Sequence, residues 1–501
     1  MSDHHEIERT FTVDSRTTMP DLAGVGAVAS VGPPVVVDLE AAYLDTPDLA
    51  LVRAGITLRR RTGGGDEGWH LKLPVGPGRD EVHHPLGEPD GDGADEQVPA
   101  ALRDLVRAYA GGQDLCVVAT IGTRRTTSEL LDNDDAVLAE VCDDEVTGRL
   151  PDGPTVSWRE WEVELVGGDL ELLDLITDEL AEEGVVPART QRKIEAVLGD
   201  RLCEPTPPEH PLVAYLAAQV DALRTQDVAI RRGQDRGVHQ ARVACRRIRS
   251  ALAAYRPLVD TEVTEPVRAE LRWLGHALGD TRDAVVAREL LLAALESEDP
   301  ELVHGPVRER VVSTYDARAR EGMAGAVQVL DGERYAALLV ALRSLVEQPP
   351  LVLPDEPSHK AMAKRLRTQA RRVARRLAEV HQAESAEARE LAWHEVRKAA
   401  KRLRYAAEVA RPQLGKPAKR LVREVKEVTQ VLGERQDTVV VRTHLLTLAQ
   451  EAAAAGEPTF TYGLLHARQE ALQVELAYRA WETLDMLKSG TRIAGVAVRL
   501  K

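Results

Sequence analysis

Aromatic residues are scarce in this sequence, which has two Phe, nine Tyr and six Trp among its 501 residues. Proteins that bind single-stranded nucleic acid stack the bases on aromatic side chains, so a surface of this class has little material here. No motif of a known nucleic-acid reader is present either. We therefore do not expect DNA or RNA as a partner.

Cysteines and long hydrophobic runs are also few. The four cysteines are scattered without CxxC spacing, a pattern that argues against both a disulfide framework and a thiolate metal site. No stretch approaches the roughly 20 apolar residues that a membrane-spanning helix needs. The N-terminus, MSDHHEIERTF, lacks the apolar segment of a secretory signal. We therefore expect a cytoplasmic protein without a membrane partner.

Basic residues are scarce in the first part of the chain only. Residues 1–200 contain 17 Lys and Arg against 41 Asp and Glu, whereas residues 201–501 contain 48 against 40. The formal net charge of −16 therefore combines an acidic part with a basic part. Such asymmetry indicates different partners for the two parts, with a polyanion for the second.

Hydrophobic periodicity divides the chain near residue 200. Short alternating runs such as WREWEVELV predict antiparallel strands, with two helices near residues 99–112 and 170–184. Four prolines in residues 201–211 predict a linker. Beyond it, a 3.6-residue period predicts helices, interrupted by a second proline cluster at 349–359. The sequence thus predicts an α+β protein of two domains, residues 1–200 and an all-α domain at 212–501.

The helical part contains an internal repeat. The segment HQARVACRRIR at 239–249 aligns with HEVRKAAKRLR at 394–404, and LGDTRD at 278–283 aligns with LGERQD at 432–437. Two paired motifs at nearly equal offsets indicate a duplication. We therefore expect tandem helical bundles at about 212–348 and 359–501.

Both copies of the repeat carry a stripe of basic side chains at spacing 0, 3, 7 and 10, which is one face of a helix. A third stripe lies in residues 360–376, which contain eight basic residues and no acidic one. The stripes are His239, Arg242, Arg246 and Arg249; His394, Arg397, Lys401 and Arg404; and Lys360, Lys364, Arg367, Arg371 and Arg375.

Like charges at these spacings destabilise a helix by about 0.2–0.5 kcal/mol per pair, so an external anion is expected against the stripes. A linear chain of phosphates fits, because its oxyanions accept charge-assisted hydrogen bonds from guanidinium and ammonium groups. The alternative is that the stripes are solvated or paired with acidic side chains.

Charged side chains alternate along several predicted strands, so that acids and bases share single strand faces. A solvent-facing side would explain any one of these strands. Together they predict a closed antiparallel barrel whose charged lumen surrounds an ionic ligand. Carboxylates without nitrogen or sulfur ligands suit Mg²⁺ or Mn²⁺. The alternating residues are Glu6 and Glu8, Arg59 and Arg61, His70 and Lys72, Arg79 and Glu81, Glu140 and Asp144, and Glu160, Glu162 and Glu164.

Four segments closely resemble the CYTH family, the triphosphate tunnel enzymes. They are EIERTF at the N-terminus, AAYLDTPDLALVRAGITLRRR at 41–61, WHLKLPVGPGRDE at 69–81 and WREWEVEL at 158–165. The resemblance covers nearly all of residues 1–200. It implies a β-barrel tunnel that binds a triphosphate-type ligand with a divalent cation.

The resemblance also implies roles for individual residues. Glu6 and Glu8 match the two acids of the opening ExExK motif, but Thr10 stands at its lysine position, and Arg9 is expected on the opposite strand face. Lys193 resembles a late basic residue near the tunnel mouth.

The implied metal ligands are Glu6, Glu8, Glu162 and Glu164, with Glu140 and Asp144 added from the strand alternation. The implied triphosphate-binding residues are Arg59, Arg61, Lys72, Arg125 and Lys193, and the catalytic set is Glu6, Glu8, Arg59, Arg61 and Lys72.

The duplicated helices with their LG(D/E)xxD motifs resemble the CHAD domain over about 212–501. This resemblance implies inorganic polyphosphate as the partner of the basic stripes, with association to polyphosphate granules. For the whole chain we expect a Mg²⁺- or Mn²⁺-dependent hydrolase of tripolyphosphate or short polyphosphate. Two alternatives stay open. One is a non-catalytic polyphosphate-binding or granule-targeting factor, and the other is an organic-triphosphate enzyme of the thiamine-triphosphatase or adenylate-cyclase type.

Overall fold

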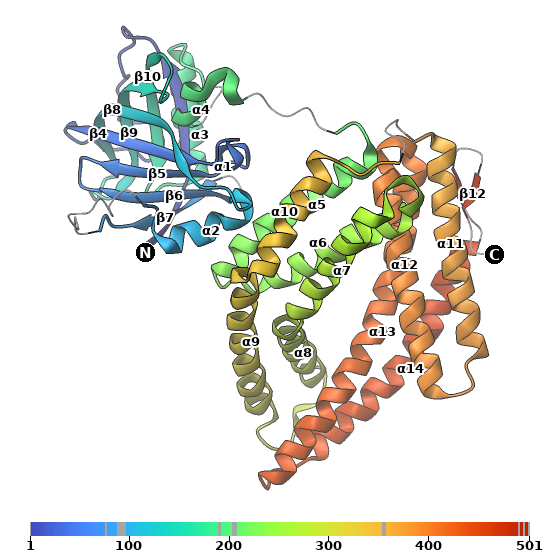
Figure 1. Ribbon diagram of the computed structural model, residues 1–501. Helices are drawn as coiled ribbons and strands as arrows, with labels where there is room; N and C mark the ends of the chain where they lie inside the picture. Colours follow the sequence, from blue (N-terminus) through green and yellow to red (C-terminus); the bar gives the residue numbers. More distant parts are fainter. Residues whose placement is uncertain are drawn as a thin grey trace. The chain divides into compact units, whose positions relative to one another are not determined.

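The chain divides into two compact units, Met1–Thr206 and Pro207–Lys501. The computed structural model describes residues 2–75, 78–87, 97–188, 192–202, 208–352, 357–488, 491–493 and 496–498. The first unit is built on a β-sheet and the second on helices (Figure 1). No helix in the described residues is long and apolar enough to cross a membrane.

The sheet of the first unit nearly closes into a barrel. Its antiparallel path runs β1-β7-β6-β5-β4-β8-β9-β10-β2, and the two end strands are separated in the chain by Ile7 alone. One bent N-terminal segment therefore pairs with both edges of the sheet. The strands are β1 (Ser2–Glu6), β2 (Glu8–Val13), β3 (Ser30–Val31), β4 (Val35–Asp45), β5 (Thr57–Thr62), β6 (Gly68–Val75), β7 (Gly78–His84), β8 (Cys116–Leu131), β9 (Val137–Arg149) and β10 (Thr155–Leu165).

The alternation along β10 separates a hydrophobic face from a charged one. Trp161 and Val163 are fully buried in a cluster that includes Phe11 of β2 and Ile176 of helix α3 (Leu170–Glu182). The Asp169 side chain caps α3 by accepting a hydrogen bond from the Leu172 amide at 3.0 Å. The helix therefore covers the outer face of β10 and β2, and the intervening glutamates of β10 face the barrel interior.

A second hydrophobic cluster joins the barrel wall to helix α4 (Lys193–Leu198). It contains Ile194 and Val197 of α4 together with Tyr43 and Ile121 of β4 and β8. A Cβ atom added to Gly148 of β9 would lie 2.2 Å from the Val197 side chain, so the glycine lets α4 approach the sheet. The remaining helices of this unit are α1 (Ala50–Arg53), α2 (Ala100–Ala110) and the 3-10 helix at Gly199–Leu202.

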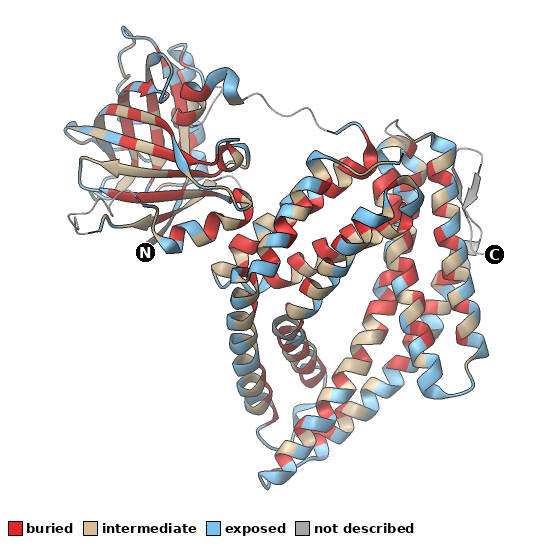
Figure 2. Cartoon of the chain, viewed as in Figure 1, coloured by how far each residue is buried: buried red, intermediate tan, exposed pale blue. Residues whose placement is uncertain are grey.

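The second unit is helical, with the buried residues in stripes along its helices (Figure 2). Its helices are α5 (Pro211–Arg231), α6 (Asp235–Ala254), α7 (Thr261–Ala277), α8 (Gly279–Glu296), α9 (Val307–Asp331), α10 (Glu333–Glu347), α11 (His359–Gln382), α12 (Ala386–Leu414), α13 (Lys416–Ala454) and α14 (Phe460–Lys488). Short 3-10 turns lie at Arg256–Leu258 and Pro300–Leu302.

Two details differ from the sequence-based expectation. Residues of the predicted 201–211 linker take part in both units: the 3-10 helix ends at Leu202, and Pro211 is the first residue of α5, where proline is favoured. Residues 203–207 lie outside the described part. The helical unit also contains two short antiparallel strands, β11 (Thr491–Ile493) and β12 (Val496–Val498). The all-α expectation did not include them, because these runs are too short for a hydrophobic period to be read.

The two halves of the helical repeat share one core. Leu291 of α8 and Tyr315 of α9 belong to the same buried cluster as Leu445 of α13 and Tyr462 of α14. Helices α6 and α12, which carry the duplicated basic motif, are also in contact. The two segments for which the sequence predicts a tandem duplication therefore pack into a single body.

Gly148→Ala should destabilise the first unit, because the new methyl group meets Val197 at 2.2 Å. Overpacking of this kind costs about 1–3 kcal/mol of unfolding free energy. Urea unfolding of Gly148→Ala and of Gly148→Ala/Val197→Ala measures the effect, and the second variant should recover stability. Gly122→Ala on β8 is the matched control, since its nearest atom lies at 3.9 Å. Equal stability of the two single variants would contradict the packing argument.

Candidate functional site

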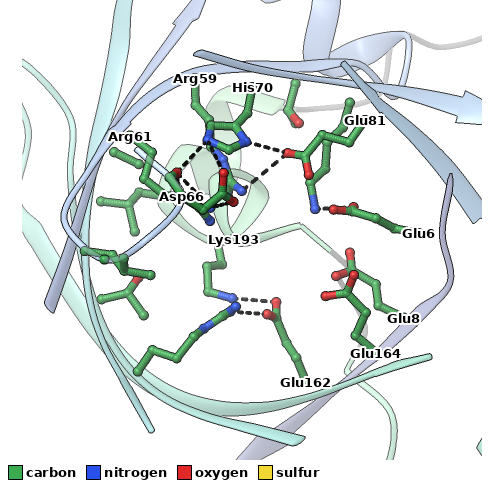
Figure 3. A pocket seen from close by; sticks show the side chains of 18 of the residues that line it. Glu6, Glu8, Arg59, Arg61, Asp66, His70, Glu81, Glu162, Glu164 and Lys193 are labelled. Atoms are coloured by element: carbon green, nitrogen blue, oxygen red, sulfur yellow. Dashed lines mark hydrogen bonds and ion pairs between the residues drawn. The ribbon is translucent and has the colours of Figure 1, made fainter. Parts of the chain in front are cut away.

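The barrel interior contains a cavity of about 580 Å³. Figure 3 shows charged side chains pointing into it from the surrounding strands, with Lys193 entering from α4. The charged residues that line it are Glu6, Glu8, Arg59, Arg61, Asp66, His70, Lys72, Arg79, Glu81, His83, Arg125, Glu140, Glu162, Glu164, Arg192 and Lys193. The cavity thus brings together every residue of the predicted tunnel site except Asp144, which contacts two of its lining residues.

Three carboxylates form a row across the barrel wall. Glu164 of β10 is paired in register with Glu8 of β2 on one side and with Glu140 of β9 on the other. Burial raises the pKa of Glu164 to about 7, an effect that the neighbouring acids Glu8, Glu162 and Glu140 increase and Lys72 opposes. Buried acids that repel one another provide oxygen ligands for a hard cation, which would relieve the repulsion.

A second carboxylate cluster surrounds Lys193. Its Nζ lies 2.9 Å from Asp144 Oδ2, 2.7 Å from Glu160 Oε1 and 2.5 Å from Glu162 Oε1. Arg125 adds a bidentate contact to Asp144 at 2.6 and 2.8 Å and a contact to Glu162. Although burial opposes it, the two cations hold the pKa of Glu162 below its usual range. The protein itself therefore compensates Glu162, whereas burial raises the pKa of Glu160 against the effect of Lys193.

Lys72, Glu6 and Glu81 form a third group. Lys72 contacts Glu6, and the Glu81 carboxylate lies 2.8 Å from Nδ1 of His70. Burial and a hydrogen bond with Glu81 raise the pKa of Glu6 to about 8, while Lys72 opposes the rise. The pKa of Glu81 is held low by His70 and Glu6 against the effect of burial. Burial and the shared hydrogen bond therefore favour the ionised form of Glu81 over that of Glu6.

The arginines of β5 lie beside these groups. Arg59 donates to the Tyr43 hydroxyl at 3.4 Å and lies 3.8 Å from Glu81, and Arg61 contacts the Asp66 carboxylate. On β7, Arg79 pairs with Glu8 at 3.2 Å. One part of the cavity wall therefore presents guanidinium groups, and the row of Glu8, Glu140 and Glu164 presents carboxylates.

In the helical unit, the two repeated stripes converge. Arg246 of α6 lies close enough to Arg397 and Lys401 of α12 to add to the lowering of the pKa of both by burial. Burial and the neighbouring arginines lower the pKa of Lys401 to about 7. Tyr405 accepts hydrogen bonds from Arg246 at 3.2 Å and from Arg404 at 3.1 Å, and it holds these two guanidinium groups together.

The other stripe residues differ in their surroundings. Arg242 pairs with Asp283 at 2.9 Å, and His394 lies 3.2 Å from the Gln436 side-chain oxygen. His239 is half-buried on α6. The third stripe follows α11, where Lys360, Lys364, Arg371 and Arg375 are exposed and Arg367 is half-buried.

Comparisons with known proteins agree with this geometry. The model of the CYTH domain matches residues 4–190, and the model of the CHAD domain matches residues 214–446. The chain is a CYTH–CHAD fusion protein. An uncharacterized protein found in two strains of Mycobacterium tuberculosis is 37% identical over 503 residues, which span 96% of this chain and 95% of the relative.

Two solved structures are similar to part of the chain. PptA from Streptomyces chartreusis is 19% identical, with a TM-score of 0.45, over 55% of this chain and all of its own. The CHAD domain from the plant Ricinus communis is 23% identical, with a TM-score of 0.45, over 56% of this chain and 93% of its own.

The CYTH unit departs from the family's opening motif at Thr10. Thr10 is buried and paired in register with Glu162, the acid that Lys193 contacts. Arg9 points to the outer face, where it binds Asp174 of α3 at 2.9 Å and the Leu173 carbonyl. An ammonium group therefore does lie against Glu162, but it comes from α4 and not from β2.

Several residues of the CYTH cavity were absent from the predicted site. Glu81 and Glu160 were visible in the strand alternation. Glu81 lines the cavity and contacts His70, and Glu160 contacts the lining residue Lys193. Asp66 and Arg192 lie outside the strands, where no periodicity marks them. Such residues are found only when the loop and helix are placed against the barrel.

The CHAD unit contains a further group of arginines that the stripes did not include. Burial lowers the pKa of Arg402 on α12 to about 10, and Arg372, Arg268 and Arg249 add to the shift. Arg249, at the end of the first stripe, is also influenced by Arg246, which belongs to the other group. The two groups are therefore neighbours through α6. Arg372 follows the predicted Arg371 by one position, and so points to a different side of α11.

Lys193→Met should destabilise the protein at neutral pH, because it leaves Asp144 and Glu162 with Arg125 as their cation and takes from Glu160 the lysine that contacts it. Removing one partner of a buried ion pair costs about 3–5 kcal/mol. The pKa of Glu162 is lowered in the folded state, so its contribution is present above the unfolded value and is lost as the pH falls. The difference between variant and parent should therefore shrink on acidification.

Urea unfolding at neutral pH and at about pH 4 tests this prediction. Lys193→Met/Glu160→Gln is the matched variant, since it removes one of the uncompensated acids and should recover part of the loss. A constant difference across the pH range would show that Lys193 acts through packing and not through charge.

Proposed function

We propose that the CYTH unit is a Mg²⁺- or Mn²⁺-dependent hydrolase of tripolyphosphate or short polyphosphate, and that the CHAD unit binds long inorganic polyphosphate. The observation that supports this most directly is the cavity itself, in which a row of carboxylates and a set of guanidinium groups share one interior. A triphosphate bound with its cation presents both charges in the same way.

The carboxylate row fits the cation. Glu8, Glu140 and Glu164 offer oxygen donors, and the raised pKa of Glu164 indicates negative charge that the protein leaves incompletely compensated. Glu6 extends the row along the N-terminal segment. When bound, a divalent cation supplies Lewis-acid polarisation of the phosphoryl oxygens. CYTH tunnel domains are generally metal-dependent, and this donor set agrees with that property.

The basic residues fit the phosphates. Arg59, Arg61 and Lys72 each contact a carboxylate, and the exposed Asp66 on Arg61 is the partner most easily exchanged for phosphate. Guanidinium groups bind phosphate oxygens through paired hydrogen bonds. Held in place by their strands, these groups would orient the phosphate chain and stabilise the charge that develops on its oxygens during attack by water.

Lys193 places an ammonium group against Glu162, the strand partner of Thr10. Lys193 itself stands at a basic position of the family pattern, so the cavity has one lysine fewer than that pattern. We infer that Lys193 holds Glu162 in its ionised form without a lysine at position 10. The same contacts make Lys193 the residue that links α4 to the cavity.

The CHAD stripes fit a longer chain of phosphates. Arg246, Arg397 and Lys401 lie close together, and burial, with the two arginines adding to its effect, lowers the pKa of Lys401. A polyanion would neutralise the group. Polyphosphate held by this unit would also raise the concentration of phosphate near the tethered CYTH unit.

Phosphate release from tripolyphosphate by the full-length protein, with Mg²⁺ and with Mn²⁺, tests the catalytic proposal. Glu8→Gln/Glu164→Gln removes two carboxylates of the row and should reduce turnover by at least about a hundredfold, a typical scale for lost charge stabilisation. Glu145→Gln is the matched control, because Glu145 is exposed on the opposite face of β9. ATP and thiamine triphosphate serve as competing substrates.

Turnover that both glutamine variants retain equally would contradict the tunnel assignment. Turnover of an organic triphosphate alone would assign the cavity to that class of enzyme. No turnover of any substrate, with tight polyphosphate binding, would leave the protein a binding factor.

Polyphosphate binding should weaken as the pH rises above about 7, because the bound polyanion favours the ammonium form of Lys401, whose pKa in the free protein is about 7. One linked proton changes affinity by at most about tenfold per pH unit. Lys401→Arg keeps the charge at every pH and should flatten this dependence between pH 7 and pH 9. Titration calorimetry at several pH values measures it. An unchanged slope in the variant would show that Lys401 does not take up the proton.

A further inference from the structure

Two histidines and one aspartate meet in the wall of the CYTH cavity. His70 of β6 and His83 of β7 are paired directly across the two strands, so their side chains share one face. Asp66 approaches them from the loop between β5 and β6. One ligand atom from each residue lies within 4.8 Å of the other two. Figure 3 shows Asp66 and His70 set apart from Glu8 and Glu164.

The distances suit a small cation after a modest adjustment. Asp66 Oδ1 lies 3.6 Å from His83 Nε2 and 3.8 Å from His70 Nε2. Metal–ligand bonds of ~2.0–2.2 Å place neighbouring ligand atoms roughly 3.3–3.5 Å apart in a tetrahedral site. The Asp66 side chain is 58% exposed and follows three glycines, so it can move by this amount.

His70 is oriented as metal-binding histidines are. Its Nδ1 lies 2.8 Å from the Glu81 carboxylate, which fixes the proton on Nδ1 and leaves Nε2 facing Asp66 and His83. The imidazole is almost completely buried.

The place of His83 depends on a glycine. A Cβ atom at Gly68 would lie 2.2 Å from His83 Nε2 and 2.9 Å from its Cδ2, so any other residue at position 68 would displace the ring. The ring centroids of His70 and His83 are 4.9 Å apart. His70 Nε2 lies 3.2 Å from the main-chain oxygen of Asp66, and His83 Nε2 lies 3.2 Å from that of Glu67, so a cation at the Nε2 atoms would take the place of any proton shared with these oxygens.

We propose that Asp66, His70 and His83 form a second metal site of the CYTH unit, selective for a borderline divalent cation such as Zn²⁺ or Co²⁺. Two imidazoles and one carboxylate prefer such ions over Mg²⁺, which takes oxygen ligands. A fourth position remains for water or a ligand from the cavity. The site is independent of the carboxylate row and does not require the proposed hydrolysis.

Titration of the full-length protein with Co²⁺, in excess Mg²⁺ to saturate the carboxylates, tests the proposal through the visible absorption of the bound ion. Calorimetry with Zn²⁺ gives the affinity. We expect one equivalent to bind, with affinity reduced at least tenfold in His83→Gln. Glu81→Gln should weaken binding by about 10–100-fold, as loss of a carboxylate behind a histidine ligand does.

His84→Gln is the matched control, because the next residue of β7 faces the other side of the sheet and its Nδ1 lies 2.9 Å from the Pro85 carbonyl oxygen. It should bind like the parent. Circular dichroism confirms that each variant is folded.

The proposal is overturned if no saturable Co²⁺ absorption develops, or if His83→Gln and His84→Gln bind alike. It is equally overturned if Glu164→Gln abolishes Zn²⁺ binding while His83→Gln leaves it intact. These outcomes are read without phosphate release, so they are distinct from failure of the hydrolase.

Discussion

The CYTH unit depends on the mutual compensation of charges inside a barrel. Each unpaired ionised group in such an interior costs several kcal/mol, so acids and bases have to be matched by position. Lys193 with Asp144, Glu160 and Glu162 is the most concentrated example. These ion pairs hold α4 against the wall of the barrel. The absence of a side chain at Gly148 leaves room for Val197 of α4 to approach β9.

Compensation of charge is uneven around the cavity. Glu162 is fully ionised between two cations, whereas burial and neighbouring acids raise the pKa of Glu164 to about 7. The environment of Glu162 is that of a complete salt bridge, whereas the environment of Glu164 favours an added cation. Asp66 on Arg61 shows the converse, because an exposed carboxylate there compensates a guanidinium group of the cavity.

In the CHAD unit, several positive charges lie close together. Arg246, Arg397 and Lys401 gather on α6 and α12, and burial together with the two arginines lowers the pKa of Lys401. Tyr405 keeps the guanidinium groups of Arg246 and Arg404 in place without neutralising them. The CYTH unit contains counter-charges of its own, whereas this group of basic residues is where we propose that an external anion binds.

Much of the site was predictable because strand and helix periods are properties of the chain itself. The alternation in WREWEVEL separates Trp161 and Val163 from Glu162 and Glu164 in any sheet that buries one face. The spacing of Arg242, Arg246 and Arg249 likewise defines one helical face. The sequence also determined that residue 10 brings no charge to the barrel, since its side chain is threonine.

Other features were decided only by the tertiary structure, because they join residues whose separation in sequence has no regular period. The contact of Lys193 with Glu162 requires α4 to pack on the barrel, and the role of Tyr405 requires α6 to meet α12. The shared core of α8, α9, α13 and α14 could not be read from two similar motifs. The pairing of His70 with His83 depends on strand register, which sequence patterns leave open and which cross-strand packing alone selects.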